Sequence, residues 1–175
     1  MDLMKTMLDR RSIRVFTDEP VSDEDLEKIL DAGMLAPTGK GIRPWHFIVV
    51  TDPAHIKALV GCRKGGPKML KTATAVIAVL GDTTKSDTCI EDSSVVLDHM
   101  YLMASSMGLG SCWLQVRLRP SEEDGITTEE FLRKRLGFPE ELELEAMLVL
   151  GHPAQTPAPH TLQELPQGRV HREQW

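Results

Sequence analysis

The sequence predicts an α+β domain in which helices flank a mixed β-sheet and an extended C-terminal tail follows. Several segments carry apolar residues at helical spacing, and residues 45–51 and 74–80 are apolar on both faces, as strands covered by helices must be. Prolines recur through residues 153–175 and forbid a regular helix there. A chain of 175 residues fits one domain, so residues 1–175 are expected to form a single domain that ends in this tail.

The N-terminal part is predicted to pass from a short helix through an extended ribbon to a second helix and a loop. Residues 2–9 have Leu and Met at helical spacing, whereas β-branched residues alternate along residues 10–16 and favour an extended segment. Ser22 can cap the second helix, whose first turn is acidic. Its expected inward side chains are Leu26, Ile29, Leu30 and Met34. That helix stops before a loop over residues 37–44.

The remaining elements follow from the same two periodicities. Further helices are expected at about residues 53–60, 67–72, 91–107 and 127–136, and further strands at 113–116 and 146–150. Residues 81–89 are polar and are expected to form a loop. The acids from Glu140 to Glu145 are interpreted as a solvated face.

The tail keeps apolar residues to its last position. It carries Leu162, Leu165, Val170 and Trp175, although its prolines prevent it from building a core of its own. Such a segment must lie along another surface or stay disordered. We interpret it as a tail that packs on a partner subunit, with a frayed end as the alternative.

Composition narrows the possible partners. A net charge of −6 argues against nucleic acid, whose phosphates need a basic surface. The longest apolar run, residues 73–80, is too short to span a bilayer, and the first ten residues lack the apolar stretch of a signal peptide. Three cysteines without CxxC spacing and six histidines without metal-binding spacing predict no disulfide framework and no metal site. We expect a cytoplasmic protein.

The ribbon near the start of the chain is a candidate phosphate site. Residues two apart in an extended segment face the same way, so Arg10, Ser12 and Arg14 are predicted to converge while Arg11 points elsewhere. Two guanidinium groups with a hydroxyl between them suit a phosphate dianion. A solvated basic segment would explain these residues equally well on this observation alone.

Two glycine-containing segments could receive a planar ligand. In residues 36–45 the glycines permit close backbone approach, and Thr38 and Arg43 supply donors. Residues 107–115 run from the long helix into a strand and contain a Gly-x-Gly that lacks the context of a dinucleotide fingerprint. Cys112 and Trp45 are interpreted as core residues, whereas Trp113 fits either the core or a ligand site.

Taken in order, these segments resemble the motifs of the nitroreductase family of flavin enzymes. The family's Arg-Arg/His-Ser-x-Arg/Lys opening corresponds to residues 10–14, and its Pro-Ser-Ser-x-Asn-x-Gln-Pro-Trp loop corresponds to residues 37–45. Further motifs follow as Lys68-Met69-Leu70, Gly108 to Trp113, and Leu150 to Ala154. Each motif is weak alone, but their shared order and spacing cover essentially the whole chain.

The resemblance implies a homodimer with two flavin mononucleotide (FMN) sites, each built from both subunits. Phosphate contacts would come from Arg10, Arg11, Ser12 and Arg14, and contacts from the other subunit's loop would come from Pro37, Thr38, Gly39 and Arg43. The ring would lie against Trp113, Leu114 and Gln115, with Lys68 near its pyrimidine edge. Hydride transfer to a flavin needs stacking and orientation, so no catalytic side chain is expected.

Departures from the family pattern concern the ligand contacts more than the fold. Gly41 and Arg43 stand where the family loop has Asn and Gln, so a guanidinium would replace an amide at the ring. His99 replaces an Asn in the long helix. The family's C-terminal basic residue corresponds to His160 or to Arg169, and a histidine ligand would bind phosphate less well above its pKa.

The implied activity is transfer of reducing equivalents from NAD(P)H through FMN to a small electron-poor acceptor, such as a nitroaromatic, a quinone or an enone. Two alternatives stay open. One is a divergent member that performs reductive dehalogenation or flavin cleavage. The other is a flavin-binding sensor or carrier without turnover.

Overall fold

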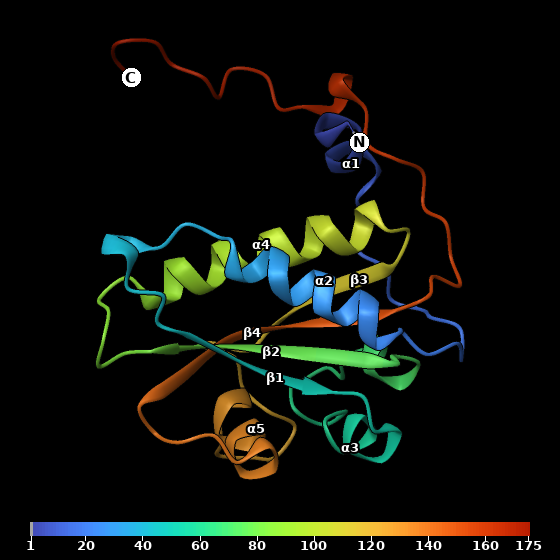
Figure 1. The fold of residues 1–175 in the computed structure, drawn as a ribbon, viewed down its shortest axis with the longest axis vertical. Coiled ribbons are helices and arrows are strands. Elements are labelled where there is room, and N and C mark those ends of the chain that lie inside the picture. Colours follow the sequence, from blue (N-terminus) through green and yellow to red (C-terminus); the bar gives the residue numbers. More distant parts are fainter. Residues whose placement is uncertain (1) are drawn as a thin grey trace.

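A four-stranded sheet forms the centre of the computed structural model, which describes residues 2–175 (Figure 1). Its strands are β1 (Trp45–Val50), β2 (Ala75–Asp82), β3 (Gly110–Gln115) and β4 (Leu142–Gly151), in the order β1-β2-β4-β3. All three neighbouring pairs are antiparallel. One isolated bridge, Ser12 to Ser111, adds a parallel contact at the β3 edge.

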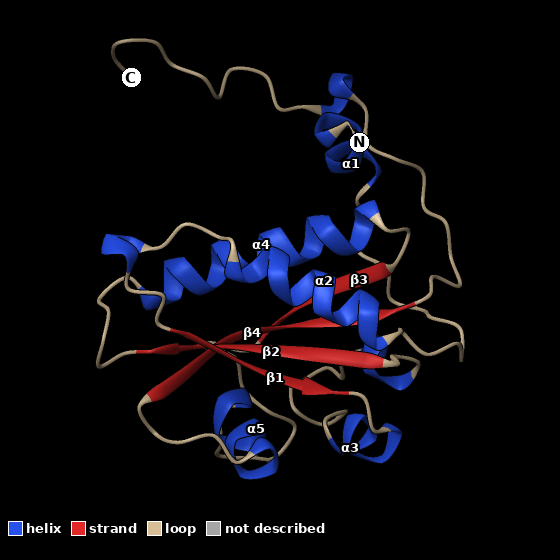
Figure 2. Cartoon of the chain, viewed as in Figure 1, coloured by secondary structure: helices blue, strands red, loops and turns tan. Residues whose placement is uncertain are grey.

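Helices cover both faces of this sheet (Figure 2). The α-helices are α1 (Leu3–Asp9), α2 (Asp23–Met34), α3 (Pro53–Ala58), α4 (Cys89–Ser106) and α5 (Thr128–Leu136), and the 3-10 turns are η1 (Gly39–Gly41), η2 (Lys68–Lys71) and η3 (Leu162–Glu164). The pair α2 and α4 lies on one face, and α3 and α5 lie on the other. The predicted α+β class is confirmed. No helix within residues 2–175 is both long and apolar enough to cross a membrane.

Strands β2 and β4 are buried on both faces, as the apolar pattern of residues 74–80 predicts for β2. The same prediction is wrong for residues 45–51, because β1 is an edge strand in which His46 and Val49 are exposed. Every residue of β2 is buried. On the α4 side, Ile77 and Leu148 pack with Met100, whereas on the other side Ala78 and Met147 belong to the same cluster as Phe131. The sheet therefore separates two hydrophobic cores, and α4 packs on the sheet through one of them.

Local sequence signals set the helix boundaries. The hydroxyl of Ser22 accepts a hydrogen bond from the backbone N–H of Asp25 at 3.1 Å, which confirms the predicted cap of α2. Met34 is wrong as an inward residue, because it is 45% exposed at the end of α2. The expected helix at 67–72 is the shorter 3-10 turn η2.

Strands β3 and β4 begin earlier than the sequence pattern indicates. Strand β4 starts at Leu142, so Glu143 and Glu145 lie within the sheet. The prediction of a solvated acidic face is wrong for Glu145, which is only 6% exposed. Its position coincides with a shift of register, since Val79 pairs with Ala146 whereas Leu80 pairs with Leu144. A bulge of this kind re-aims a side chain that strict alternation would place elsewhere.

The tail leaves β4 and passes α1 before it extends away from the sheet (Figure 1). Pro153 bridges to Phe16, and the backbone N–H of His160 donates to the carbonyl of Leu8 at 2.8 Å. From residue 161 to 175 every residue is exposed, including the four apolar residues Leu162, Leu165, Val170 and Trp175. The last part of the tail is thus not buried against its own chain, and Trp175 is fully exposed.

Candidate functional site

The ribbon of residues 10–14 is held against the start of β3. The backbone N–H of Ile13 donates to the carbonyl of Ser111 at 2.9 Å, within the isolated parallel bridge. A Cβ added to Gly110 would lie 2.9 Å from Cγ2 of Ile13, so only glycine lets the ribbon approach this closely. The ribbon is therefore anchored through its backbone and through buried Ile13, which leaves the side chains on its other face available.

Arg10 and Ser12 lie next to Tyr101 of α4. The Arg10 guanidinium lies 4.7 Å from the centre of the Tyr101 ring, and the hydroxyls of Ser12 and Tyr101 are 2.9 Å apart. Arg14 is exposed and donates to the carbonyl of Ser12 at 3.3 Å. Arg10 and the Ser12 hydroxyl thus meet at Tyr101, whereas Arg14 reaches only the Ser12 backbone.

Tyr101 is a site residue that the sequence argument missed. It is the only tyrosine of the chain and is buried within the apolar face of α4. A single tyrosine among Val, Leu, Met and Ala was the available signal, because a buried hydroxyl needs a hydrogen-bond partner. Its partner is Ser12, and this contact connects α4 to the ribbon.

Arg11 points away from the other two arginines, as predicted for alternate residues. Its guanidinium donates to the backbone carbonyl of Ala158 in the tail. A cavity of about 170 Å³ lies beside it and is lined partly by Ile13, Ser111 and Pro157. This volume is below the range of about 300–1,000 Å³ that is usual for ligand pockets, and Arg10, Ser12 and Arg14 do not line this cavity.

The predicted ring-binding residues lie at the β3 edge and divide between its two faces. The indole N–H of Trp113 donates to Oε1 of Gln115 at 2.8 Å, and both side chains are half-buried on the same face. Leu114 is completely buried on the opposite face, so only its backbone is available to a ligand. Cys112 is confirmed as a core residue, and burial raises the pKa of its thiol.

The loop of Thr38 and Gly39 is fixed to the other end of α4. Asp92 accepts hydrogen bonds from the Thr38 hydroxyl at 3.0 Å, the Gly39 backbone N–H at 2.9 Å and the Thr88 hydroxyl at 3.2 Å. Pro37 and Arg43 are exposed on either side, and the Arg43 N–H donates to the Thr38 hydroxyl at 3.2 Å.

Asp92 is a second residue whose role the sequence did not reveal. It is only 6% exposed, and its three donors compensate the burial of its charge. Asp98, six residues further along α4, is exposed, so these two acids do not form an acid–base pair. Asp92 serves the geometry of the loop.

The ribbon and the loop are two separate half-sites on one chain. Asp92 and Tyr101 are nine residues apart on α4, which corresponds to about 14 Å along a helix that rises 1.5 Å per residue. The same rigid helix therefore carries a phosphate-type donor set near one end and a donor loop near the other.

The three remaining predicted residues lie apart from this donor set. Lys68 is exposed on η2, and Arg169 lies in the exposed part of the tail. Nδ1 of His160 lies 3.0 Å from a carboxylate oxygen of Glu164, and this hydrogen bond lowers the pKa of Glu164. None of these three forms a hydrogen bond with Arg10, Ser12 or Arg14 among the described residues.

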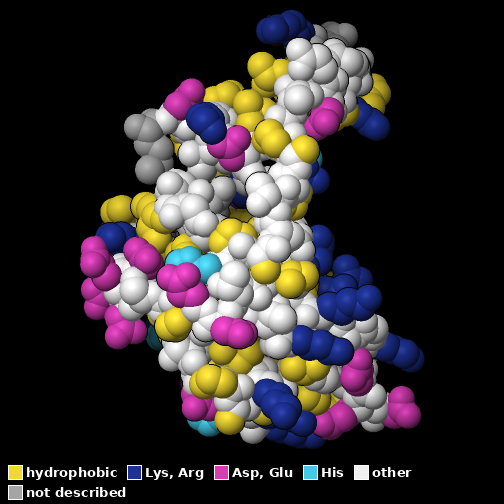
Figure 3. All heavy atoms as spheres, turned by 90° about the vertical axis from the view of Figure 1, so that its right-hand side faces the viewer, with side chains coloured by type: hydrophobic (Ala, Val, Ile, Leu, Met, Phe, Trp, Pro, Cys, Tyr) yellow, Lys and Arg dark blue, Asp and Glu magenta, His cyan; other side chains and the backbone are white. Residues whose placement is uncertain are grey.

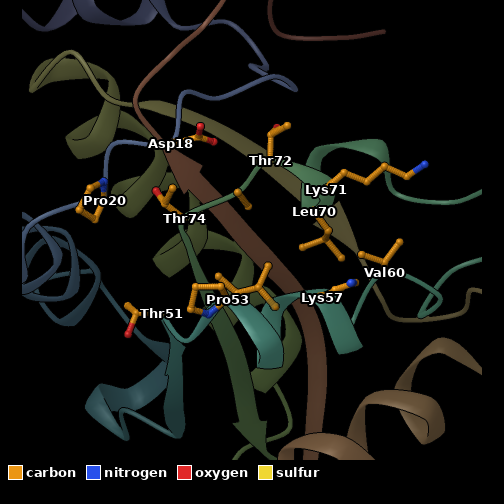
Figure 4. Close-up of a pocket in the computed structure, with 12 residues that line it drawn as sticks. Asp18, Pro20, Thr51, Pro53, Lys57, Val60, Leu70, Lys71, Thr72 and Thr74 are labelled. Carbon is orange, nitrogen blue, oxygen red and sulfur yellow. The ribbon is translucent and has the colours of Figure 1, made fainter.

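A larger cavity, of about 960 Å³, opens between α3 and η2 (Figure 4). Pro53, Val60 and Leu70 give it an apolar wall, and Thr72 and Thr74 also line it. None of the predicted cofactor residues lines it. Figure 3 views the molecule from the right-hand side of Figure 1 and shows Lys and Arg side chains gathered toward one edge. The protein thus has a locally basic surface although its net charge is negative.

The profile of the nitroreductase family matches residues 7–64 and 61–152. A protein of Archaeoglobus fulgidus, provisionally named NADH dehydrogenase/NAD(P)H nitroreductase, is 37% identical over 99% of both chains. The FMN reductase [NAD(P)H] of Bacillus subtilis is 26% identical, with 99% of this chain and 74% of that protein covered.

Solved structures show the same similarity. An FMN-dependent nitroreductase from Clostridium difficile R20291 superimposes with a TM-score of 0.94 at 37% identity, covering 98% of this chain and 99% of that one. A structure from Desulfovibrio desulfuricans, described as a nitroreductase in complex with FMN, gives a TM-score of 0.75 at 26% identity, with 98% of each chain covered.

Proposed function

Because the chain belongs to the nitroreductase family of oxidoreductases, we propose that it binds FMN and passes reducing equivalents from NAD(P)H to a small electron-poor acceptor. The observation that carries the proposal is the ribbon, where Arg10 and Ser12 meet at Tyr101 and Arg14 extends beside them. Relatives of similar length that are named for FMN support the choice of cofactor.

The donor set fits the phosphate end of FMN. A phosphate dianion has acceptors only, and the ribbon offers two permanently charged guanidinium groups and one hydroxyl. Ser12 can accept from Tyr101 and donate outward, because a hydroxyl has one donor and two acceptor positions. Arg10 lies over the Tyr101 ring, so its charge is held in place.

The ring of the flavin would lie along the β3 edge. Trp113 and Gln115 present their side chains there, and Leu114 presents its backbone. Lys68 would place a positive charge near the pyrimidine edge, where it would favour an anionic reduced ring. Arg11, His160 and Arg169 are candidates for additional phosphate contacts. Arg11 donates a hydrogen bond to the first part of the tail, and His160 belongs to that part.

We further propose that the site is completed by a second copy of the chain. The loop of Pro37, Thr38, Gly39 and Arg43 is fixed about 14 Å along α4 from the ribbon, so it is directed to a different ligand from the one its own ribbon holds. A two-fold related partner would bring its loop to this ribbon and receive this loop in return.

Bound FMN would supply the redox chemistry by accepting hydride from NAD(P)H and delivering electrons to the acceptor. The residues of this chain would then bind FMN, orient its ring and shield it from water. The ribbon would hold the phosphate and the β3 edge would orient the ring. The partner's loop, in which Lys40 and Arg43 have left-handed backbones, would complete the site. The acceptor class proposed is a nitroaromatic, quinone or enone.

A visible absorbance spectrum of the purified protein tests this function. The proposal predicts a yellow protein, or one that becomes yellow with added FMN, which NADH or NADPH bleaches and a quinone or nitroaromatic restores. A yellow protein that neither nicotinamide bleaches would be a flavin carrier instead. A colourless protein that FMN cannot reconstitute would overturn the proposal.

A further inference from the structure

Glu145 is a buried carboxylate at an irregularity of the sheet. The pairing of β2 and β4 passes from Val79–Ala146 to Leu80–Leu144, so Glu145 has no partner on β2. Only 6% of the residue is exposed. A buried carboxylate is costly unless it is hydrogen-bonded, and bulges are frequent next to active sites, so its contacts need an explanation.

These contacts form a chain that leads to the β3 edge. Oε1 of Glu145 accepts from the amide nitrogen of Gln115 at 3.2 Å, and Oε1 of Gln115 accepts from the indole N–H of Trp113 at 2.8 Å. The backbone carbonyl of Glu145 also accepts from the Gln115 amide at 3.3 Å. Oε2 of Glu145 has no hydrogen-bond partner among the described residues.

The direction of this chain is fixed by the chemistry of its two ends. An indole can only donate, and an ionised carboxylate can only accept. The carboxamide of Gln115 must therefore turn its oxygen to Trp113 and its nitrogen to Glu145. The backbone carbonyls of Glu145 and, at 3.4 Å, of Arg117 also accept from this nitrogen, so the Glu145 carboxylate is the one side-chain acceptor among three. Without that carboxylate the carboxamide would be held less firmly, and the indole would lose the fixed position of its partner.

We propose that Glu145 is a positioning residue that fixes the orientation of Gln115 and, through it, the indole of Trp113. The inference rests on the proposed function, which places the flavin ring against Trp113 and Gln115. Glu145 would not touch the cofactor. It would set the geometry of the surface on which the ring lies.

Glu143 provides the matched comparison. It precedes Glu145 by two residues on β4, is partly exposed and accepts from Nε of Arg117 at 2.6 Å. It makes no hydrogen bond to Gln115 or Trp113 among the described residues. Removing Glu143 thus removes an acid from the same strand and leaves the proposed chain intact.

Indole N–H signals in a ¹H–¹⁵N NMR spectrum of the apoprotein test the inference without cofactor. The chain has three tryptophans, and Trp113→Phe assigns the signal of Trp113. We expect Glu145→Ala to move that signal and to speed its exchange with solvent by about fivefold or more. Glu145→Gln keeps an acceptor for Gln115 and should give the wild-type position of the Trp113 signal. Glu143→Ala should leave that signal in place.

Flavin-loaded protein supplies a second measurement. The visible band of bound FMN should change shape in Glu145→Ala and return in Glu145→Gln. Should Glu145→Ala fail to fold, Gln115→Met breaks the same chain and should itself move the Trp113 signal, because the indole then loses its acceptor. A Trp113 signal that stays in place in Glu145→Ala or in Gln115→Met would overturn the inference. A wild-type protein that binds no FMN would overturn the proposed function but leave the apoprotein result valid.

Discussion

Arg10 and Arg14 reach the candidate phosphate position in different ways. Arg10 is held over the ring of Tyr101, whereas Arg14 is exposed and has only the carbonyl of Ser12 as a partner. Preorganisation reduces the entropy that binding costs, so Arg10 should contribute more than Arg14 to the affinity for phosphate. Both contributions should depend on the phosphate and not on the ring.

We therefore predict that Arg10→Ala and Arg14→Ala weaken FMN much more than riboflavin. Each hydrogen bond to a charged group contributes about 1.5–3 kcal/mol, so the Kd of FMN should rise roughly ten- to hundredfold in each variant. Titration of the apoprotein followed by flavin fluorescence measures both ligands. The loss should be larger for Arg10→Ala.

Arg119→Ala is the matched control, since Arg119 is an exposed arginine outside the ribbon. It should leave both affinities within about twofold, as is usual for surface substitutions. If riboflavin loses as much affinity as FMN in the ribbon variants, the arginines support the fold and do not bind phosphate.

At the scale of elements, the loop after α2 depends on a close contact with the turn before α4. A Cβ on Gly39 would lie 2.3 Å from the Thr88 hydroxyl, which itself donates to Asp92. We predict that Gly39→Ala lowers the free energy of unfolding by about 1–3 kcal/mol through overpacking. The cost should fall clearly in a Thr88→Ala background, where the obstructing oxygen is gone. Urea denaturation of the four proteins gives the coupling.

Gly61→Ala separates this contact from a general effect of glycine replacement. Its new Cβ would meet only ordinary contacts, with Cζ of Phe131 at 3.5 Å as the nearest atom. This variant should be neutral within about 1 kcal/mol. Additive costs for Gly39→Ala and Thr88→Ala would refute the proposed contact.

The turn that follows β2 makes stability depend on pH in the acid range. Lys85, at 2.7 Å, and the Thr84 hydroxyl and N–H hold the pKa of Asp82 at about 2, below its ordinary value of 3.8. A carboxyl with a lowered folded-state pKa stabilises the fold above its unfolded pKa and loses this effect as the pH falls. Stability from Asp82 is thus complete above about pH 4 and is lost toward about pH 2.

Asp82→Asn should remove this dependence. The free energy of unfolding of the wild-type protein should fall more steeply between about pH 4 and pH 2 than that of the variant, and the two curves should approach each other at the acid end. Acid titrations followed by circular dichroism in the presence of urea measure both curves. Parallel curves across this range would show that Asp82 does not supply the acid sensitivity.

At the scale of the whole molecule, periodic patterns predicted most elements, because a helix or strand buries one face at a fixed spacing. The alternation at Arg10, Ser12 and Arg14 and the burial of Cys112 follow from such local rules. Tyr101 could not be linked to Ser12 from sequence, because 89 residues separate them and only the packing of α4 brings them together.

The sequence did not predict the burial of Glu145 or the role of Asp92, for a different reason. In the sequence, Glu145 belongs to an acidic segment that is predicted to be exposed. The bulge that buries it depends on how β2 pairs with β4. Asp92 reads as a helix-surface acid until the loop at Thr38 packs onto it. In both cases a long-range contact satisfies a polar group, and no local pattern records that contact.

The tail is the part of the molecule whose structure one chain does not explain. Its first half is fixed by contacts of Pro153 and His160 with the N-terminal segment, whereas residues 161–175 are exposed with Trp175 at the end. These exposed apolar residues favour an interaction surface, and a second copy of the chain is the partner that we propose for it.

Removing residues 166–175 should therefore dissolve the dimer while leaving the fold intact, because the contacts of the tail with its own chain end before this point. Size-exclusion chromatography with light scattering should give twice 19.5 kDa for the wild-type chain and a monomer for the truncated one, with FMN lost in parallel. Val170→Ser with Trp175→Ser in the full-length chain should weaken the dimer in the same direction, whereas Gln174→Ala should not. A truncated protein that remains dimeric and yellow would show that the tail does not embrace the partner.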